Sequence, residues 1–337
     1  MTLTACSNGN SAGGDEAMSP GSTAATIGAQ ATASAASISP TPVPTILAPP
    51  LPTPAPAGDD ATTNVDPTAD PAELPIPGSS AELAAALSQA ELALRAPGTD
   101  EAGARPWGRR QQVLYRTLAA NPSWADDVVV TVDPAVSRAV VENWTARREL
   151  SAMFPDVLGT TLPAWRIKAP APAEELLAYY REASEVTGVP WEILAAINLI
   201  ETKMGRIDGL SSAGAVGPMQ FLPTTWEECC QGDPTLNADA IRGAAEYLID
   251  RGAGSDLDRA IFGYNNSDHY VRAVRAYAAV MADYPDAYLG YHAWQVLVLT
   301  AQGLILLPEG YEQPEAIDVA TWIADHPDSL YELAASP

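Results

Sequence analysis

The chain has 337 residues, of which 42 are acidic and 18 are basic, so that its formal net charge is −24 at pH 7. Because no basic residues gather on one face, this charge balance excludes nucleic acid as an expected partner. The three cysteines and three histidines exclude a disulfide framework and a metal site built from Cys and His.

The first residues predict a lipid anchor. Residues Leu3-Thr-Ala-Cys6 match the cleavage pattern of bacterial lipoproteins, in which Cys6 receives the lipid. The positively charged and apolar segments that precede such a site are missing, and the first basic residue is Arg95. Either residues 1–6 are the end of a truncated signal peptide or the match is accidental. We expect the former, and therefore an exported cell-envelope protein anchored on the outer face of the cytoplasmic membrane.

Residues 7–79 are expected to form a disordered linker. They consist mainly of Ala, Ser, Thr, Pro and Gly, and they include the run Pro49-Pro-Leu-Pro-Thr-Pro-Ala-Pro56. Such a composition buries too little apolar surface to offset the entropy of the chain, and its prolines favour polyproline II. The linker would tether the ordered part of the protein to the membrane.

The rest of the chain is predicted to be mostly helical. Apolar spacing, capping residues, first-turn prolines and glycine stops predict helices over 80–95, 109–120, 134–154, 172–188, 190 to beyond Glu201, 237–251 and 267–281. Residues 162–166 are expected to be an extended connector. Two β-rich runs, 294–300 and 304–307, predict a hairpin that is too short to span a membrane.

Glu201 is the most informative residue of the predicted helices. At about 100° per residue, its side chain falls in the same arc as Ile193, Ile197 and Ile200, whereas Lys203 falls on the opposite side. Burying an unpaired carboxylate is costly, so such a group is either protonated or tightly paired. A protonated Glu201 would suit a general acid, and a structural pair with a buried Arg is the alternative.

Two later segments are expected near Glu201. Residues 211–226 begin with a glycine-rich stretch, whose backbone can approach a ligand closely, and continue into an apolar run that looks like a helix start. Residues 262–270 place Tyr264 and Asn265 in a short break between two helices. Hydroxyl, amide and aromatic groups are what recognition of an acetamido sugar requires. Each segment is common alone, but their order and spacing after Glu201 are specific.

With these motifs the chain resembles the lytic transglycosylases with a lysozyme-like SLT domain, closest to the membrane-bound lytic transglycosylase B type. The resemblance rests on Glu201-Thr-Lys-Met-Gly205, Gly217-Pro-Met-Gln-Phe221, Gly263-Tyr-Asn-Asn-Ser267 and Tyr270-Val-Arg, and it covers residues 170–282, with 81–165 matched more loosely. It implies that Glu201 is the catalytic acid/base in cleavage of the N-acetylmuramic acid to N-acetylglucosamine bond of peptidoglycan. It also implies that substrate is bound by Ser211, Gly217, Met219, Gln220, Tyr264, Asn265 and Tyr270.

The resemblance further implies a mechanism with one carboxylate. Most glycosidases need two, but the only acid near Glu201 in the sequence, Asp208, is interpreted as a solvated turn residue. Protonated Glu201 would donate to the glycosidic oxygen while the acetamido group stabilises the developing cation. Glu201 would then deprotonate the sugar's own C6 hydroxyl, which closes a 1,6-anhydro ring. Burial can raise a Glu pKa enough for this role.

Two features concern metals and thiols. The resembling family often carries a calcium loop, but here a loop starting at Asp233 would have Ala244 at the position of the bidentate ligand. We therefore expect no metal and no cofactor, and we expect the acidic residues to cap the helix that starts near Asn237. For the adjacent Cys229 and Cys230, two reduced thiols are favoured over a vicinal disulfide.

The sequence as a whole predicts an all-α fold of lysozyme-like type, in the α+β sense of that fold. A helical N-terminal region (80–165) would pack on a catalytic domain (166–282), followed by a C-terminal extension with a small β-hairpin (283–337). The expected partners are peptidoglycan strands and, through the lipid anchor, the membrane. The alternatives are a muramidase that uses water and a catalytically silent peptidoglycan-binding protein, which the presence of Glu201 disfavours.

Overall fold

The computed structural model describes residues 70–153 and 158–331, which belong to one compact unit. The predicted lipid-attachment site Cys6 and residues 7–69 of the expected linker lie outside the described residues. In the part of the chain that is described, no helix is both long and apolar enough to cross a membrane.

The ordered part begins earlier than expected. Residues 70–79, which were assigned to the linker, contain the short 3₁₀ helix η1 (Pro71–Glu73). The Arg110 guanidinium donates hydrogen bonds of 2.8 Å to the carbonyl oxygens of Leu74 and Pro75. These contacts fix the segment before the first α-helix, so the folded part starts before residue 80.

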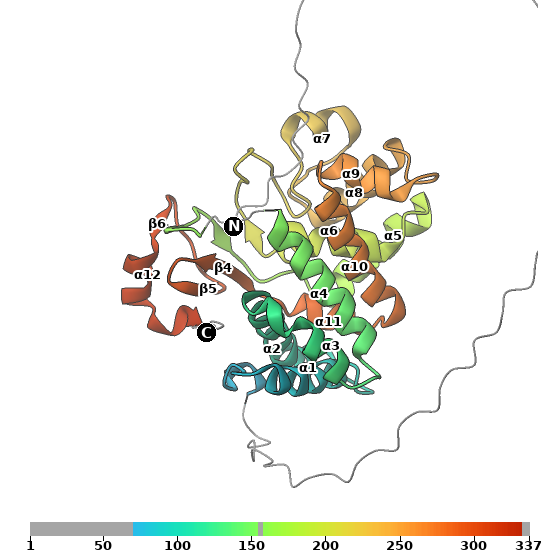
Figure 1. Cartoon of the computed structure of the whole chain (residues 1–337). Coiled ribbons are helices and arrows are strands. Elements are labelled where there is room, and N and C mark those ends of the chain that lie inside the picture. Colours follow the sequence, from blue (N-terminus) through green and yellow to red (C-terminus); the bar gives the residue numbers. More distant parts are fainter. Residues whose placement is uncertain (1–69, 154–157, 332–337) are drawn as a thin grey trace, which may run out of the picture. The chain divides into compact units, whose positions relative to one another are not determined.

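Helices dominate the structure, and a small antiparallel sheet lies near the C-terminus (Figure 1), which confirms the mainly helical fold expected from the sequence. The α-helices of the described residues are α1 (Ser80–Leu94), α2 (Glu101–Ala120), α3 (Ala125–Thr131), α4 (Ser137–Ala152), α5 (Ala173–Thr187), α6 (Trp191–Thr202), α7 (Pro223–Cys229), α8 (Asn237–Asp250), α9 (Leu257–Tyr264), α10 (Asp268–Asp283), α11 (Ala287–His292) and α12 (Val319–Asp325). The strands are β1 (Thr161–Leu162), β2 (Arg166–Ile167), β3 (Ile207–Asp208), β4 (Val296–Thr300), β5 (Gly303–Leu307), β6 (Ile317–Asp318) and β7 (Leu330–Tyr331), and η2 (Pro122–Trp124) and η3 (Pro327–Ser329) are further 3₁₀ turns.

Local capping explains where several helices begin and end. The side chains of Ser79, Asp100 and Ser267 each accept a hydrogen bond from the backbone N–H three residues later, which satisfies one of the free donors at a helix start. Gly188 ends α5 with a φ of 78°, a left-handed conformation that glycine adopts without strain. Helix α2 starts at Glu101 because Asp100 caps it, eight residues earlier than predicted.

The predicted hairpin is present and is part of a larger sheet. Strands β4 and β5 pair antiparallel from Val296 opposite Leu307 to Thr300 opposite Gly303. Strand β7 adds to the other side of β5, giving the order β4-β5-β7. The connector expected over 162–166 contributes short strands instead, since β1 pairs with β6 and β2 pairs with β3.

Helix α6 is the centre of the main core. All ten residues from Ile193 to Thr202 are buried, and α10 packs against both α4 and α6. The same cluster of buried side chains includes residues of α1, α2 and α4 as well as residues of α5, α8 and α10. The expected domain boundary at residue 165 therefore separates segments that share one hydrophobic core.

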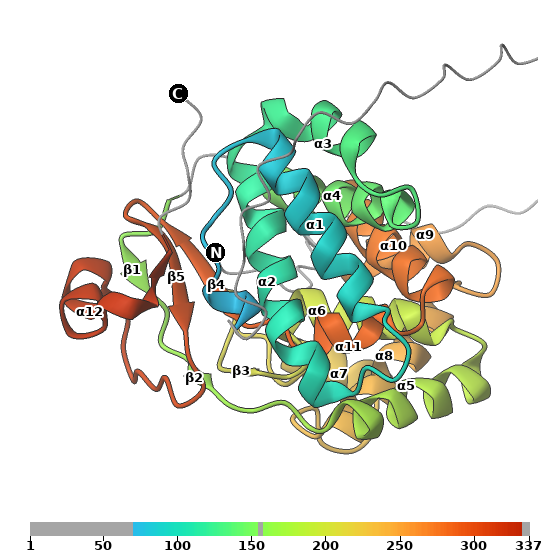
Figure 2. The ribbon, with the colours of Figure 1, turned by 90° about the horizontal axis from the view of Figure 1, so that it is seen from below.

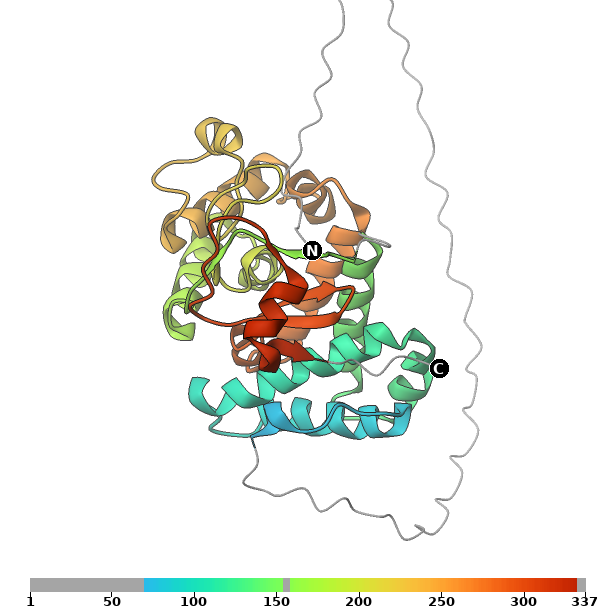
Figure 3. The same ribbon diagram turned by 90° about the vertical axis from the view of Figure 1, so that its left-hand side faces the viewer.

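A second, smaller core joins the C-terminal sheet to the middle of the chain. Leu162, Trp165 and Ile167 pack with side chains of β4, β5 and α12. Figure 2 shows this sheet between α12 and α2, and in Figure 3 the sheet and α12 face the viewer in front of the helices. The sheet thus lies next to helices of the N-terminal region.

The two adjacent cysteines correct one expectation. Cys229 and Cys230 form a disulfide at the C-terminal end of α7, where reduced thiols were favoured. Their Cα atoms are 3.7 Å apart. The prediction of two reduced thiols, which relied on ordinary disulfide spacing, is therefore wrong.

Candidate active site

The end of helix α6 places Glu201 in a pocket. Helix α6 stops at Thr202, and the next three residues have positive φ values of 55° (Lys203), 61° (Met204) and 81° (Gly205). This sharp left-handed turn takes Lys203 out of the helical spacing. Its side chain consequently lines the same pocket as Glu201, although the helical pattern had placed it on the opposite side.

The Glu201 carboxyl group is buried and has one free oxygen. The residue is 5% exposed, and its Oε1 accepts a hydrogen bond of 2.6 Å from the Tyr270 hydroxyl. Its Oε2 is buried and has no hydrogen-bond partner among the described residues. Burial raises the pKa of Glu201 to about 7, although the Tyr270 hydrogen bond and the Lys203 charge act in the opposite direction. Glu201 can therefore both give and take a proton near neutral pH.

The loop after Glu201 is fixed to α6 by buried hydrogen bonds. The Asn198 amide and the Thr202 hydroxyl donate to the carbonyl oxygen of Pro218, at 2.7 and 2.6 Å. The Tyr264 hydroxyl donates to the carbonyl oxygen of Met219 at 2.6 Å. Because both carbonyls are held, Gln220, which has a positive φ of 51°, is directed into the pocket.

Four of the residues predicted for the site come together. Ser211 and Gln220 line the pocket with Glu201, and Tyr270 touches the carboxyl group of Glu201. The Ser211 hydroxyl accepts hydrogen bonds from the backbone N–H groups of Ala213 and Ala215. Its position is thus set by the loop, and because these two hydrogen bonds use both lone pairs of the hydroxyl, its proton remains for a ligand.

The other four predicted residues have different surroundings. Met219 and Tyr264 are buried in the main core and do not line this pocket. Gly217 is required by the loop, because a Cβ atom there would lie 1.8 Å from the carbonyl oxygen of Pro234. Asn265 is a buried residue at the C-terminal cap of α9. In this structure Met219, Tyr264 and Gly217 support the loop that carries Gln220.

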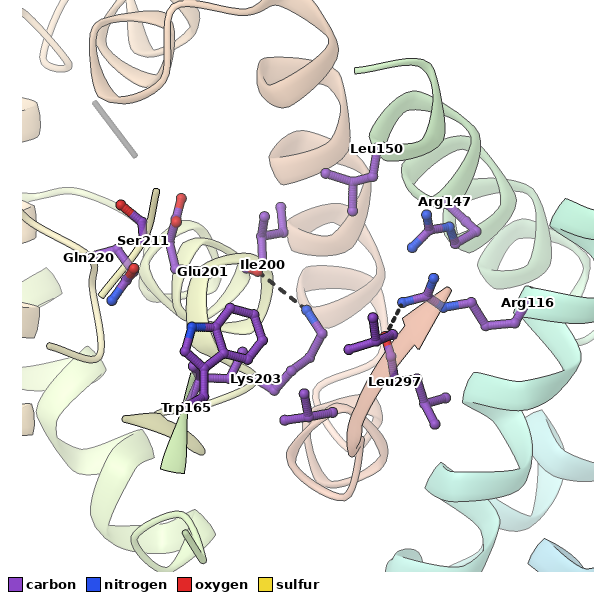
Figure 4. Close-up of a pocket in the computed structure, with 13 residues that line it drawn as sticks. Arg116, Arg147, Leu150, Trp165, Ile200, Glu201, Lys203, Ser211, Gln220 and Leu297 are labelled. Atoms are coloured by element: carbon purple, nitrogen blue, oxygen red, sulfur yellow. Dashed lines mark hydrogen bonds between the residues drawn. The ribbon is translucent and has the colours of Figure 1, made fainter. Parts of the chain in front are cut away.

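The pocket extends well beyond the predicted motifs. Figure 4 shows Glu201, Ser211 and Gln220 at one end, Arg116 and Arg147 at the other, and Trp165 and Lys203 between them. Its volume is about 70 Å³, and its remaining walls are apolar. The described residues that line it are Arg116, Arg147, Leu150, Trp165, Ile200, Glu201, Lys203, Ile207, Ser211, Gln220, Val296, Leu297 and Val298.

The pocket residues outside the motifs come from several separate parts of the chain. Arg116 is on α2, Arg147 is on α4, and Val296 to Val298 are on β4. A sequence pattern around Glu201 cannot reveal them, because they meet only through the packing of α2, α4 and the C-terminal sheet. Of these residues, only Trp165 had a feature in the sequence that could have suggested a ligand contact, since it is an aromatic residue in a predicted extended connector.

Asp208 lies in strand β3 and is half-buried, whereas the sequence had predicted a solvated turn residue. Its carboxylate pairs with Arg166 on the neighbouring strand and with Lys168, 3.9 Å away. It is not among the described residues that line the Glu201 pocket. Of those lining residues, Glu201 is the only carboxylic acid.

The loop that starts at Asp233, which was considered as a calcium loop, is stabilised by hydrogen bonds between its own residues. Asp239 accepts from the Asp233 backbone N–H at 3.0 Å and pairs with Arg242 at 2.7 Å. Leu236, and not an acidic residue, is the N-cap of α8, so the expected capping by acidic side chains is wrong; Asp239 lies within the first turn instead. In the described part of the chain, no group of three or more His, Cys, Asp or Glu side chains is arranged to hold a metal ion.

Comparisons with protein-family models, curated proteins and solved structures found no match to this chain.

Proposed function

We propose that the protein is a peptidoglycan lytic transglycosylase with a lysozyme-like catalytic domain, in which Glu201 is the single acid/base. One observation carries the proposal. Glu201 is buried, has a raised pKa and an unpartnered carboxyl oxygen, and is the only acid among the described residues of its pocket. A site with one carboxyl group suits a reaction in which the substrate itself supplies the nucleophile.

The reaction follows from these groups. Protonated Glu201 donates its proton to the bridging oxygen, the bond from that oxygen to C1 of muramic acid breaks, and the acetamido group stabilises the positive charge at C1. Ionised Glu201 then takes the proton of the C6 hydroxyl, whose oxygen bonds to C1. Glu201 ends protonated as it began, and no water is consumed. Gln220 and Ser211 provide hydrogen-bonding groups for the sugar beside Glu201.

The N-terminal sequence adds a cellular location to the proposal. We expect Cys6 to carry a lipid, so that the enzyme works on the wall from the outer face of the cytoplasmic membrane. The supporting observation is the sequence pattern Leu3-Thr-Ala-Cys6 followed by a proline-rich segment. Mass spectrometry of the protein purified from membranes tests this, since an unmodified Cys6 would contradict it.

The products of cleavage test the reaction type. Purified peptidoglycan is treated with the full chain, and the soluble fragments are analysed by mass spectrometry before and after borohydride reduction. We expect fragments lighter by one water than hydrolysis products and resistant to reduction, because their muramic acid ends are 1,6-anhydro rings. Reducible muramic acid ends would instead mean a muramidase. Binding to peptidoglycan without any fragments would mean a silent binding protein.

Replacing Tyr270 by phenylalanine is expected to move the alkaline limb of the pH–rate profile to higher pH. The Tyr270 hydroxyl stabilises ionised Glu201, so its loss raises the pKa of Glu201 further. A hydrogen bond to a charged group is worth about 1.5–3 kcal/mol, which corresponds to about one to two pH units. The measurement is kcat/KM from pH 5 to 9.

The matched control for this variant is Tyr179→Phe. Tyr179 also donates to a glutamate, Glu175, but on the exposed surface of α5. Its profile should coincide with that of the unmodified protein. An alkaline limb of Tyr270→Phe that stays in place, or moves to lower pH, would argue against Glu201 as the acid.

A further inference from the structure

Three cationic side chains gather in the pocket beyond Glu201. Arg116 extends from α2, Arg147 from α4 and Lys203 from the turn after α6, and Figure 4 shows them converging on the space beside β4. The positive charges of Arg116 and Arg147 both act on Lys203, and that of Arg147 acts on Arg116. The three groups therefore form one cluster, which we call the cationic cluster.

The cationic cluster forms no ion pair among the described residues, although the charge of Glu201 acts on Lys203. Arg116 donates to the carbonyl oxygen of Leu297 at 3.3 Å, and Arg147 donates to the Ser151 hydroxyl at 3.0 Å. Lys203 donates to the carbonyl oxygens of Leu199 and Ile200 at 2.9 and 3.3 Å. These acceptors are neutral, and no ion pair of the described residues includes any of the three cations.

Such an arrangement costs folding free energy. Burial, with the charges of Arg116 and Arg147, lowers the pKa of Lys203 to about 7. Burial and the charge of Arg147 lower the pKa of Arg116 to about 9. All three residues are half-buried, and cations in such positions are usually paired, because an unpaired charge away from water is costly. A bound anion would relieve this cost, and Arg side chains bind carboxylates with two parallel hydrogen bonds.

We propose that the cationic cluster is a binding site for a carboxylate of the glycan substrate. This inference rests on the proposed function and specifies the substrate: the bound sugar carries an acidic substituent that reaches from Glu201 toward Arg116 and Arg147. Two sources have this chemistry, the lactyl carboxylate of muramic acid without a peptide and the carboxylates of a peptide stem attached to that lactyl group. An uncharged chitin chain fills the same glycan site but leaves the cationic cluster empty.

Binding to three tetrasaccharides tests the site. The full chain carrying Glu201→Gln, which should bind without cleaving, is titrated by calorimetry with chitotetraose, with the peptide-free alternating tetrasaccharide of peptidoglycan, and with its peptide-bearing form. We expect a Kd about tenfold lower for a carboxylate-bearing ligand than for chitotetraose, the gain expected of a charge-assisted hydrogen bond. The ligand that shows the preference identifies the source of the carboxylate.

Variants assign the preference to the cationic cluster. When Arg116→Gln and Arg147→Gln are added to the Glu201→Gln protein, the tenfold preference for the carboxylate-bearing ligand over chitotetraose should be lost. When Arg138→Gln is added instead, the preference should remain. Arg138 lies on α4 as well, but it pairs with Asp283 on the exposed surface. A preference that persists without both pocket arginines, or equal affinities for all three tetrasaccharides, would overturn the carboxylate site and leave the proposed function standing. If none of the tetrasaccharides binds, the proposed function fails too.

Thermal unfolding without ligand gives a second, independent result. If the arginines serve a ligand, replacing them removes two unpaired charges that are half-buried, so the melting temperature of the double variant should equal or exceed that of the parent. If they serve the fold, the melting temperature should fall by several degrees, which would contradict the proposal. The Arg138→Gln variant shows how far an ordinary surface change moves the melting temperature.

Discussion

Replacing Glu201 by glutamine is expected to lower kcat/KM for glycan cleavage by roughly 10³- to 10⁴-fold, the range that positioned acid–base groups contribute. Glutamine has nearly the same shape and can still accept the Tyr270 hydrogen bond, but it cannot donate a proton to the bridging oxygen or take one from the C6 hydroxyl. Because the proposed reaction uses Glu201 in both steps, no other described acid in the pocket can substitute. Release of soluble fragments from peptidoglycan measures the effect.

Glu192→Gln is the matched control for this change. Glu192 lies in the first turn of the same helix, α6, and is not among the described pocket residues. It should retain the activity of the unmodified protein. If Glu201→Gln cleaved peptidoglycan as fast as the control, Glu201 would be a structural carboxyl group, and the proposed reaction would be wrong.

The burial of Glu201 could be predicted, but the course of the chain after it could not. The apolar residues around Glu201 in the sequence correctly indicated a buried position in a helix. The same pattern, continued past Thr202, placed Lys203 on the opposite side. A helical wheel assumes that the helix goes on, whereas the left-handed φ of Lys203 turns its side chain back toward the pocket.

The motifs correctly predicted which segments of the chain meet. They were a poorer guide to which side chains line the pocket. The segments containing Gln220, Tyr264 and Tyr270 do come to Glu201 in the expected way. However, the Tyr264 hydroxyl holds the carbonyl oxygen of Met219, and both side chains are part of the core. Conformation within a loop depends on contacts from distant elements, which spacing along the sequence does not contain.

The cationic cluster and the domain arrangement required the tertiary structure. Arg116 and Arg147 belong to predicted helices, but nothing in their local sequence distinguishes them from surface arginines. They reach the pocket because α2 packs on α4, α4 packs on α10, and α10 packs on α6. The shared core of these helices also explains why the boundary at residue 165 does not divide the fold into two independent parts.

The same Glu201→Gln change that removes activity is expected to stabilise the protein above neutral pH. The folded-state pKa of Glu201 is about 7, above its ordinary value of 4.5, so folding disfavours the ionised form. Below pH 4.5 the group is protonated in both the folded and unfolded states, and its charge costs nothing. Between pH 4.5 and 7 the unfolded state ionises first, so the free energy of unfolding falls as pH rises, and above pH 7 the loss is complete.

The size of this loss is about 3 kcal/mol, from a shift of about 2.5 units at 1.36 kcal/mol each. Glutamine is neutral at every pH and does not have this cost. Urea unfolding at a series of pH values should therefore show a difference between variant and unmodified protein that grows from pH 4.5 to 7 and is constant beyond. The Glu192→Gln control should show no such growth.

A difference that does not change with pH would mean that Glu201 is ionised at ordinary cost in the folded protein, which would remove the basis for its role as an acid. The expected opposition between stability and activity at one residue has a single cause, because the burial that makes Glu201 a proton donor near pH 7 also makes its charge costly.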